Sequence, residues 1–76
     1  MGEVTSRVEA AIRDMIASRE LPNGRLPSER TLAADLEAGR TTIRLVLMKL
    51  ASEGVVRSEH GRGYFVADQD GSSESA

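Results

Sequence analysis

Apolar side chains recur at helical spacing near the start of this 76-residue chain. They fall at i, i+3, i+4, i+7 and i+8, which places them along one face of a helix. These residues are Val8, Ala11, Ile12, Met15 and Ile16. The pattern predicts a helix from about Ser6 to Arg19, since Ser6 and Glu9 have the spacing of a capping box. Residues 1–5 are expected to be a flexible N-terminus.

The following segment cannot continue this helix. Residues 21–28 read LPNGRLPS, with two prolines around Asn-Gly, which is typical of a turn-rich connection. Ser28 is then placed to cap a second, short helix. Leu32, Ala33 and Leu36 have the spacing of a single buried face in that helix.

A third helical pattern begins after residues 37–39, which read EAG. An interruption of about three residues is the connection length of a helix-turn-helix unit. The third helix is expected from about Arg40 to Ser52, with Gly54 as a natural stop just beyond it. Its buried stripe repeats the spacing of the first helix and comprises Ile43, Val46, Leu47, Leu50 and Ala51.

Two short runs rich in β-branched and aromatic residues follow, VVRS at 55–58 and YFV at 64–66. Five residues with two glycines separate them, so the pattern predicts a β-hairpin with an open, flexible tip. Residues 68–76 are acidic and small, which is typical of a disordered tail or the start of a linker. The expected fold class is α+β, with three helices and then a hairpin in one domain of residues 6–67.

Composition excludes several classes of protein. The chain has no cysteine, which is consistent with a reducing compartment. No apolar run approaches the roughly 18 residues that cross a bilayer, and the N-terminus lacks a secretory signal pattern, so we expect a cytoplasmic protein. With one histidine and no acidic pair on a common apolar face, the sequence offers no catalytic set, no metal site and no cofactor site. We therefore expect no enzyme.

The net charge of -2 is unevenly distributed along the chain. Residues 25–66 contain seven cations and five anions, and nine of the ten cations in the chain are arginines. The planar fork of arginine suits contacts with phosphate and guanine. Residues 40–44, RTTIR, present arginines and threonines at a helix start, where free N–H groups and the helix dipole favour an anion. The helix tip therefore predicts an anion site, and the diameter of a helix fits the major groove of DNA.

Three motifs occur in one order, LPSERTLA at 26–33, GRTTIR at 39–44 and EGVVRSEHGRGYFV at 53–66. Together they resemble the winged helix-turn-helix domain of GntR-type bacterial transcriptional regulators over about residues 6–67. The resemblance implies sequence-specific DNA binding by a metabolite-responsive repressor, with the third helix in the major groove and the hairpin wing in the minor groove. It also implies a two-fold symmetric double-stranded operator.

The same resemblance implies a homodimer formed through a separate C-terminal domain, which would also bind a small-molecule effector. We therefore expect this chain to be the N-terminal part of such a regulator, and the alternative is a protein that works alone. No membrane partner is expected.

The resemblance assigns roles on the helices by position. Arg40 and Arg44 would enter the major groove, with Arg40 as the reader of guanine. Arg30 would contact the DNA backbone or a base edge, although an ordinary solvated arginine also fits this position. Ser28 would cap its helix and contact phosphate. The remaining expected contacts on the helices are Thr41 and Thr42, which would bind phosphate or support this pose, and Thr42 also fits a capping or packing role.

The wing is expected to approach the minor groove through four residues at its tip, His60, Gly61, Arg62 and Gly63. The glycines would permit close approach of the backbone, and Arg62 would meet the negative potential of the groove. His60 fits a solvent-exposed loop histidine equally well.

Three positions depart from the family pattern. Glu37 stands where glycine is common, so either the backbone of the turn is altered or the left-handed residue has moved to Gly39. Gly39 replaces a usual serine or threonine, which removes a capping hydroxyl. Leu45 stands where a polar residue is frequent, and with Met48 it forms an apolar pair on the outer face. An alternative function is therefore a winged-helix module that binds protein through Leu45 and Met48.

Overall fold

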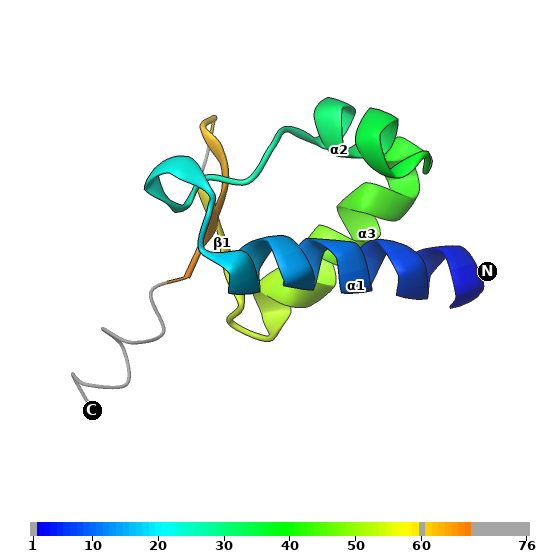
Figure 1. Ribbon diagram of the computed structural model, residues 1–76, viewed down its shortest axis with the longest axis horizontal. Helices are drawn as coiled ribbons and strands as arrows, with labels where there is room; N and C mark the ends of the chain where they lie inside the picture. The colour runs from blue at the N-terminus through cyan, green and yellow to red at the C-terminus, as the bar shows by residue number, and fades with distance from the viewer. Residues whose placement is uncertain (1, 60, 68–76) are drawn as a thin grey trace.

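Three helices precede a two-stranded antiparallel hairpin, so the predicted α+β fold class is confirmed. The helices are α1 (Gly2–Ser18), α2 (Glu29–Leu36) and α3 (Arg40–Ser52), and the strands are β1 (Val56–Glu59) and β2 (Gly63–Val66). This computed structural model describes residues 2–59 and 61–67. Figure 1 shows the hairpin at the end of the molecule opposite the start of α1. Within the described residues no helix is long and apolar enough to cross a membrane.

The first helix starts earlier than predicted. α1 begins at Gly2, and Ser6 lies inside it, so the predicted start and the Ser6–Glu9 capping box are wrong. Residues 2–5, which were expected to belong to a flexible N-terminus, form the first turn of this helix. Near this start, Arg7 Nη1 donates to the carbonyl oxygen of Leu36 at 2.6 Å. This bond ties the beginning of α1 to the end of α2 and satisfies one of the terminal carbonyl groups of that helix.

One apolar core joins all three helices to the first strand. Its buried members are Val8, Ile12, Leu26, Leu32, Ile43, Val46, Leu47, Leu50 and Val56. α3 supplies four of them, so it is the central helix of the core, and its predicted bounds are confirmed. Four of the five residues of its predicted stripe are buried, and the fifth, Ala51, is half-buried. Complete burial of one such side chain contributes about 1.5–3 kcal/mol, so this helix is fixed mainly by packing on one side.

The turn between α2 and α3 keeps its left-handed residue at Glu37. This residue has φ 53° and ψ 51°, and its N–H group and that of Ala38 close the end of α2. Gly39 is extended, with φ -70° and ψ 152°, and it is the N-cap of α3. The predicted alternative in which the left-handed conformation moves to Gly39 is therefore wrong. Arg7 Nη2 also donates to the carbonyl oxygen of Glu37 at 3.4 Å, which places a cation beside the end of α2.

The hairpin is longer than its two apolar runs. Its register pairs Val56 with Val66 and Glu59 with Gly63, so only residues 60–62 connect the strands. The sequence pattern predicted a five-residue connection. Because strand pairing depends on the partner strand, Glu59 and Gly63 join the ladder despite their weak individual preference for β structure.

The connection between α1 and α2 packs against the hairpin. It forms one 3-10 turn, η1 (Pro22–Gly24), and then Arg25 forms an isolated antiparallel bridge with Phe65. Next to this bridge, the N–H group of Leu26 donates to the carbonyl oxygen of Tyr64 at 2.9 Å. The turn is therefore held against β2, and this contact was not predicted from the sequence.

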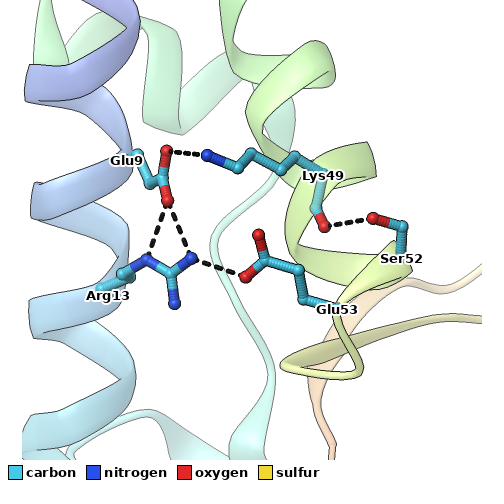
Figure 2. A network of polar contacts seen from close by, with 5 residues as sticks. All are labelled: Glu9, Arg13, Lys49, Ser52 and Glu53. Carbon is cyan, nitrogen blue, oxygen red and sulfur yellow. Dashed lines mark hydrogen bonds and ion pairs between the residues drawn. The ribbon is translucent and has the colours of Figure 1, made fainter.

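A network of charged side chains joins α1 to the end of α3 (Figure 2). Glu9 accepts hydrogen bonds from Arg13, at 2.9 and 2.8 Å, and from Lys49 at 3.0 Å. Arg13 also donates to Glu53 at 2.7 Å. These bonds hold the pKa of Glu9 below its usual value and the pKa of Arg13 above its usual value. The network therefore joins α1 to the C-terminal end of α3.

Candidate nucleic-acid interface

The start of α3 exposes three of the four residues of this helix that are expected to contact DNA. Arg40, Thr41 and Arg44 are exposed, whereas Thr42 is half-buried and so is less available than predicted. The N-cap Gly39 provides no side-chain hydrogen bond, so the first N–H groups of α3 are not capped by a hydroxyl. An anion at this position would meet these N–H groups and the positive end of the helix dipole together with two guanidinium groups.

Contacts at both sides define the outward face of α3. Arg44 on one side bonds to Glu29 of α2, and Lys49 on the other side bonds to Glu9 of α1. Between these contacts lies a face that includes Leu45 and Met48, whose side chains are 57% and 54% exposed. The predicted apolar pair on this outer face is therefore present, and it lies beyond the cationic tip of the same helix.

Arg44 is already paired with a carboxylate in the free domain. Its Nη2 and Nε atoms donate to the two oxygens of Glu29, at 3.1 and 3.3 Å. The hydrogen bonds and the charge of Glu29 raise the pKa of Arg44 above its usual value. The side chain of Arg44 remains 58% exposed, so a ligand can reach the guanidinium without rearrangement of the core. Glu29 lies beside the candidate interface, and no pattern in the sequence singled it out.

α2 begins beside this tip. The hydroxyl of Ser28 accepts a hydrogen bond from the N–H group of Thr31 at 3.1 Å, which confirms its predicted capping role. Arg30 is exposed on the first turn and forms no ion pair within the part of the chain that the structure describes. Arg30 is therefore available to an external anion, as expected from the sequence.

The hairpin tip lies on the same side of the molecule as α2 and the start of α3, at the top of Figure 1. Gly61, Arg62 and Gly63 are all exposed there. Both glycines have positive φ, 75° and 111°, a conformation that side chains disfavour, and the N–H group of Arg62 donates to the carbonyl oxygen of Glu59 at 2.9 Å. The fourth predicted tip residue, His60, lies outside the described residues.

Two further cations, which were not predicted as site residues, lie near the hairpin. Arg57 is the cross-strand partner of Phe65, and Arg25 is bridged to Phe65 from the α1–α2 connection. The hairpin register, had it been assigned from sequence, would have placed Arg57 beside Phe65. No local pattern signals the approach of Arg25, because that contact joins segments far apart in the chain.

Comparison with known proteins supports the resemblance. The sequence model of the family described as bacterial regulatory proteins, gntR family, matches residues 4–66. The Uxu operon transcriptional regulator of Escherichia coli (strain K12) is 39% identical over 69 residues, which is 90% of this chain and 27% of that protein. The histidine utilization repressor of Pseudomonas aeruginosa is 36% identical in an alignment 78 residues long that covers 96% of this chain and 31% of that protein. The chain thus spans about a third or less of these relatives.

Solved structures show the same fold. The DNA-binding domain of AraR in complex with operator ORE1 is 32% identical and has a TM-score of 0.76, over 84% of this chain and 79% of that chain. GntR of Streptococcus agalactiae is also 32% identical, with a TM-score of 0.74, over 88% of this chain and 32% of that chain. The family match over residues 4–66, together with these relatives and structures, shows that the chain belongs to the GntR family of bacterial regulatory proteins.

Proposed function

We propose that this chain is the DNA-binding part of a bacterial transcriptional repressor. α3 would lie in the major groove, with Arg40 and Arg44 directed at base edges and Thr41 at phosphate. α2 would contact the backbone through Arg30 and through its start at Ser28. The observation that supports this most strongly is the position of the start of α3 and the hairpin tip on one side of the fold (Figure 1).

The hairpin would enter the minor groove beside the site of α3. Gly61 and Gly63 lack side chains and so permit close approach of the backbone, while Arg62 meets the negative potential of that groove. His60 belongs to the same proposed contact. In this arrangement the helix reads bases and the hairpin fixes the position of the domain along the duplex.

The partners of the whole protein are part of the same proposal. One small module makes too few contacts for high affinity, so two copies would bind a two-fold symmetric operator as a homodimer. The relatives are named as an operon regulator and a repressor, and this chain spans only 27% and 31% of them. A further domain C-terminal to the present chain would form the dimer and bind a small-molecule effector.

Substitution of the proposed guanine reader tests this function. Duplexes that bind the native chain are first selected from a random pool, and the Kd is then measured on selected and scrambled duplexes. Arg40→Ala should weaken binding to the selected duplex by about 1–3 kcal/mol and relax the preference at one base pair. Binding to scrambled DNA should change much less, because that binding depends on phosphate contacts.

Arg62→Ala is the matched comparison, since it also removes one exposed guanidinium. It should weaken binding to both duplexes and reduce the salt dependence of the affinity, with preference at the helix-read base pairs retained. If Arg40→Ala bound selected and scrambled duplexes as the native chain does, a base-reading role for Arg40 would be excluded.

A second candidate function rests on the exposed apolar pair Leu45 and Met48. A module that binds protein through this face would bind its partner with little dependence on salt, because the contact is apolar. DNA binding by several arginines instead weakens steeply as salt rises. The double variant Leu45→Gln, Met48→Gln should abolish the protein contact in the second case, whereas in the first case it should leave the salt dependence intact.

A further inference from the structure

Three arginines converge on one aromatic ring at the hairpin. The Cζ atoms of Arg25, Arg57 and Arg62 lie 6.0, 5.9 and 5.8 Å from the centroid of Phe65. These distances are within the range of cation–π attraction, which favours arginine over an aromatic ring. Together with Asn23 they line a hollow of about 570 Å³. We name this set of three arginines and Phe65 the wing arginine cluster.

The cluster is built from three separate segments of the chain. Arg57 lies opposite Phe65 in the hairpin register, and Arg25 is held by its backbone bridge to the same residue. Arg62 comes from the connection between the strands, where its N–H group bonds to the carbonyl oxygen of Glu59 at 2.9 Å. The fold therefore brings Arg25 from a distant segment to two arginines of the hairpin. The three charges lie within about 12 Å of one another, because each lies about 6 Å from one point.

The positive charge of the cluster is only partly balanced. Glu59 accepts a hydrogen bond from Arg57, and this bond, with the charges of Arg57 and Arg62, holds the pKa of Glu59 below its usual value. Arg25 and Arg62 form no ion pair among residues 2–59 and 61–67. Three guanidinium groups against one carboxylate leave an excess of two positive charges around the ring, which a bound anion would compensate.

The geometry points to a phosphate-binding site that holds the DNA backbone next to the base pairs contacted by α3. A guanidinium presents several N–H donors in one plane, so it can bind two oxygens of one phosphate. With all three guanidinium groups beside the Phe65 ring, the site favours phosphate over a stacked base. This inference rests on the proposed DNA-binding function. It adds that the wing arginine cluster holds the phosphate backbone of one DNA strand.

DNA is favoured over an acidic protein because the hollow is continuous with the hairpin tip. Gly61 and Arg62 belong both to the tip and to the lining of the hollow. That tip lies on the same side of the molecule as the start of α3 (Figure 1). A backbone that leaves the tip can therefore pass directly to Arg57 and Arg25, and Arg57 would exchange its bond with Glu59 for one with phosphate.

The test uses the 76-residue chain and a duplex selected by the native chain from a random pool. Kd is measured across a range of salt for Arg25→Gln, Arg57→Gln and Glu59→Gln, with circular dichroism as a check of folding. Each arginine variant should bind several-fold more weakly, with the salt slope smaller by about 0.9 for each phosphate that is no longer neutralised. Glu59→Gln should bind more tightly than the native chain, because Arg57 is released. Glu3→Gln, which removes one negative charge at the other end of the molecule, is the control.

Modified DNA identifies the strand that is bound. Neutral methylphosphonate groups are placed one at a time along the duplex outside the preferred base pairs. At the correct positions they should weaken binding by the native chain and leave binding by Arg57→Gln unaffected. Arg57→Lys should recover only part of the affinity, since lysine keeps the charge but lacks the planar fork. This variant also distinguishes a weaker phosphate contact from a failure to fold.

The outcomes separate this inference from the proposed function. If Arg40→Ala loses base preference while the cluster variants keep native affinity and salt slope, the cluster does not bind backbone phosphate and only this inference fails. If instead the cluster variants change self-association and not DNA affinity, an acidic protein surface is the ligand and the inference is wrong. Absence of any salt-dependent duplex binding by the native chain would overturn both.

Discussion

A single residue, Glu37, sets the backbone of the turn between α2 and α3. It adopts the left-handed conformation, which costs about 1–2 kcal/mol for a residue with a side chain, whereas glycine adopts it freely. Arg7 bonds to the backbone carbonyl oxygens of Leu36 and Glu37, so the Glu37 side chain is not needed for that contact. The turn therefore holds a strained residue at the joint between two helices.

We expect Glu37→Gly to raise the free energy of unfolding by up to about 1 kcal/mol, because the relief of strain exceeds the entropy that glycine adds to the unfolded chain. Urea denaturation followed by circular dichroism measures this change. Glu37→Ala is the control, since it removes the same carboxylate and keeps a side chain on the left-handed residue. Equal or lower stability for Glu37→Gly would show that the left-handed conformation costs little here.

Glu29 controls how available Arg44 is to a ligand. Because Glu29 accepts two hydrogen bonds from this guanidinium, Glu29→Gln should release Arg44 and increase the affinity for random-sequence duplexes. Asp35→Asn removes one negative charge from the same helix and serves as the control. Fluorescence anisotropy with scrambled duplexes measures both. A similar gain in affinity for the two variants would show that Glu29 acts only through its negative charge and not through its bonds to Arg44.

At the scale of secondary structure, α1 is attached to α3 by charge as well as by apolar contact. The pKa of Glu9 is lowered by its bonds to Lys49 and Arg13, so Glu9 stabilises the fold at pH values above its ordinary pKa of 4.5. This contribution is lost as pH falls through the lower pKa of the folded state. Because all of these groups are on the surface, salt should weaken the same contribution.

The pH dependence of unfolding tests this attachment. The native chain should lose stability relative to Glu9→Gln as the pH is lowered from about 7 to below about 4, so the difference between them shrinks. Urea midpoints measured for both proteins at several pH values supply the comparison, and Glu3→Gln controls for the removal of one carboxylate. A difference that stays constant across this range would contradict a stabilising role for ionised Glu9.

Local patterns predicted the interiors of the elements and missed contacts between distant segments. The buried stripe of α3 followed from its apolar spacing, and the cap at Ser28 followed from the residue type. The early start of α1 carries no such local signal, because none of residues 3–7 is buried. The bridge between Arg25 and Phe65 joins segments far apart in the chain, so the wing arginine cluster appears only in three dimensions.

At the scale of the whole molecule, one domain presents one helix tip and one hairpin. Two copies joined by a flexible linker that spans both halves of a selected two-fold operator should bind about 10²–10⁴-fold more tightly than one copy. Titration of single and linked chains against the whole operator and against a half-site measures this gain. Equal affinity of the linked chain for both duplexes would show that the second copy does not bind simultaneously.

The internal ion pairs also make the distribution of charge uneven across the molecule. At the far end of α3, Lys49 and Arg13 are matched by acidic partners, whereas Arg40 and Arg62 at the opposite side form no ion pair within the described residues. Such a distribution is a permanent dipole, and the field around a polyanion exerts a torque on it. The domain would therefore rotate before contact, so that a larger share of diffusive collisions begins with the correct side in front.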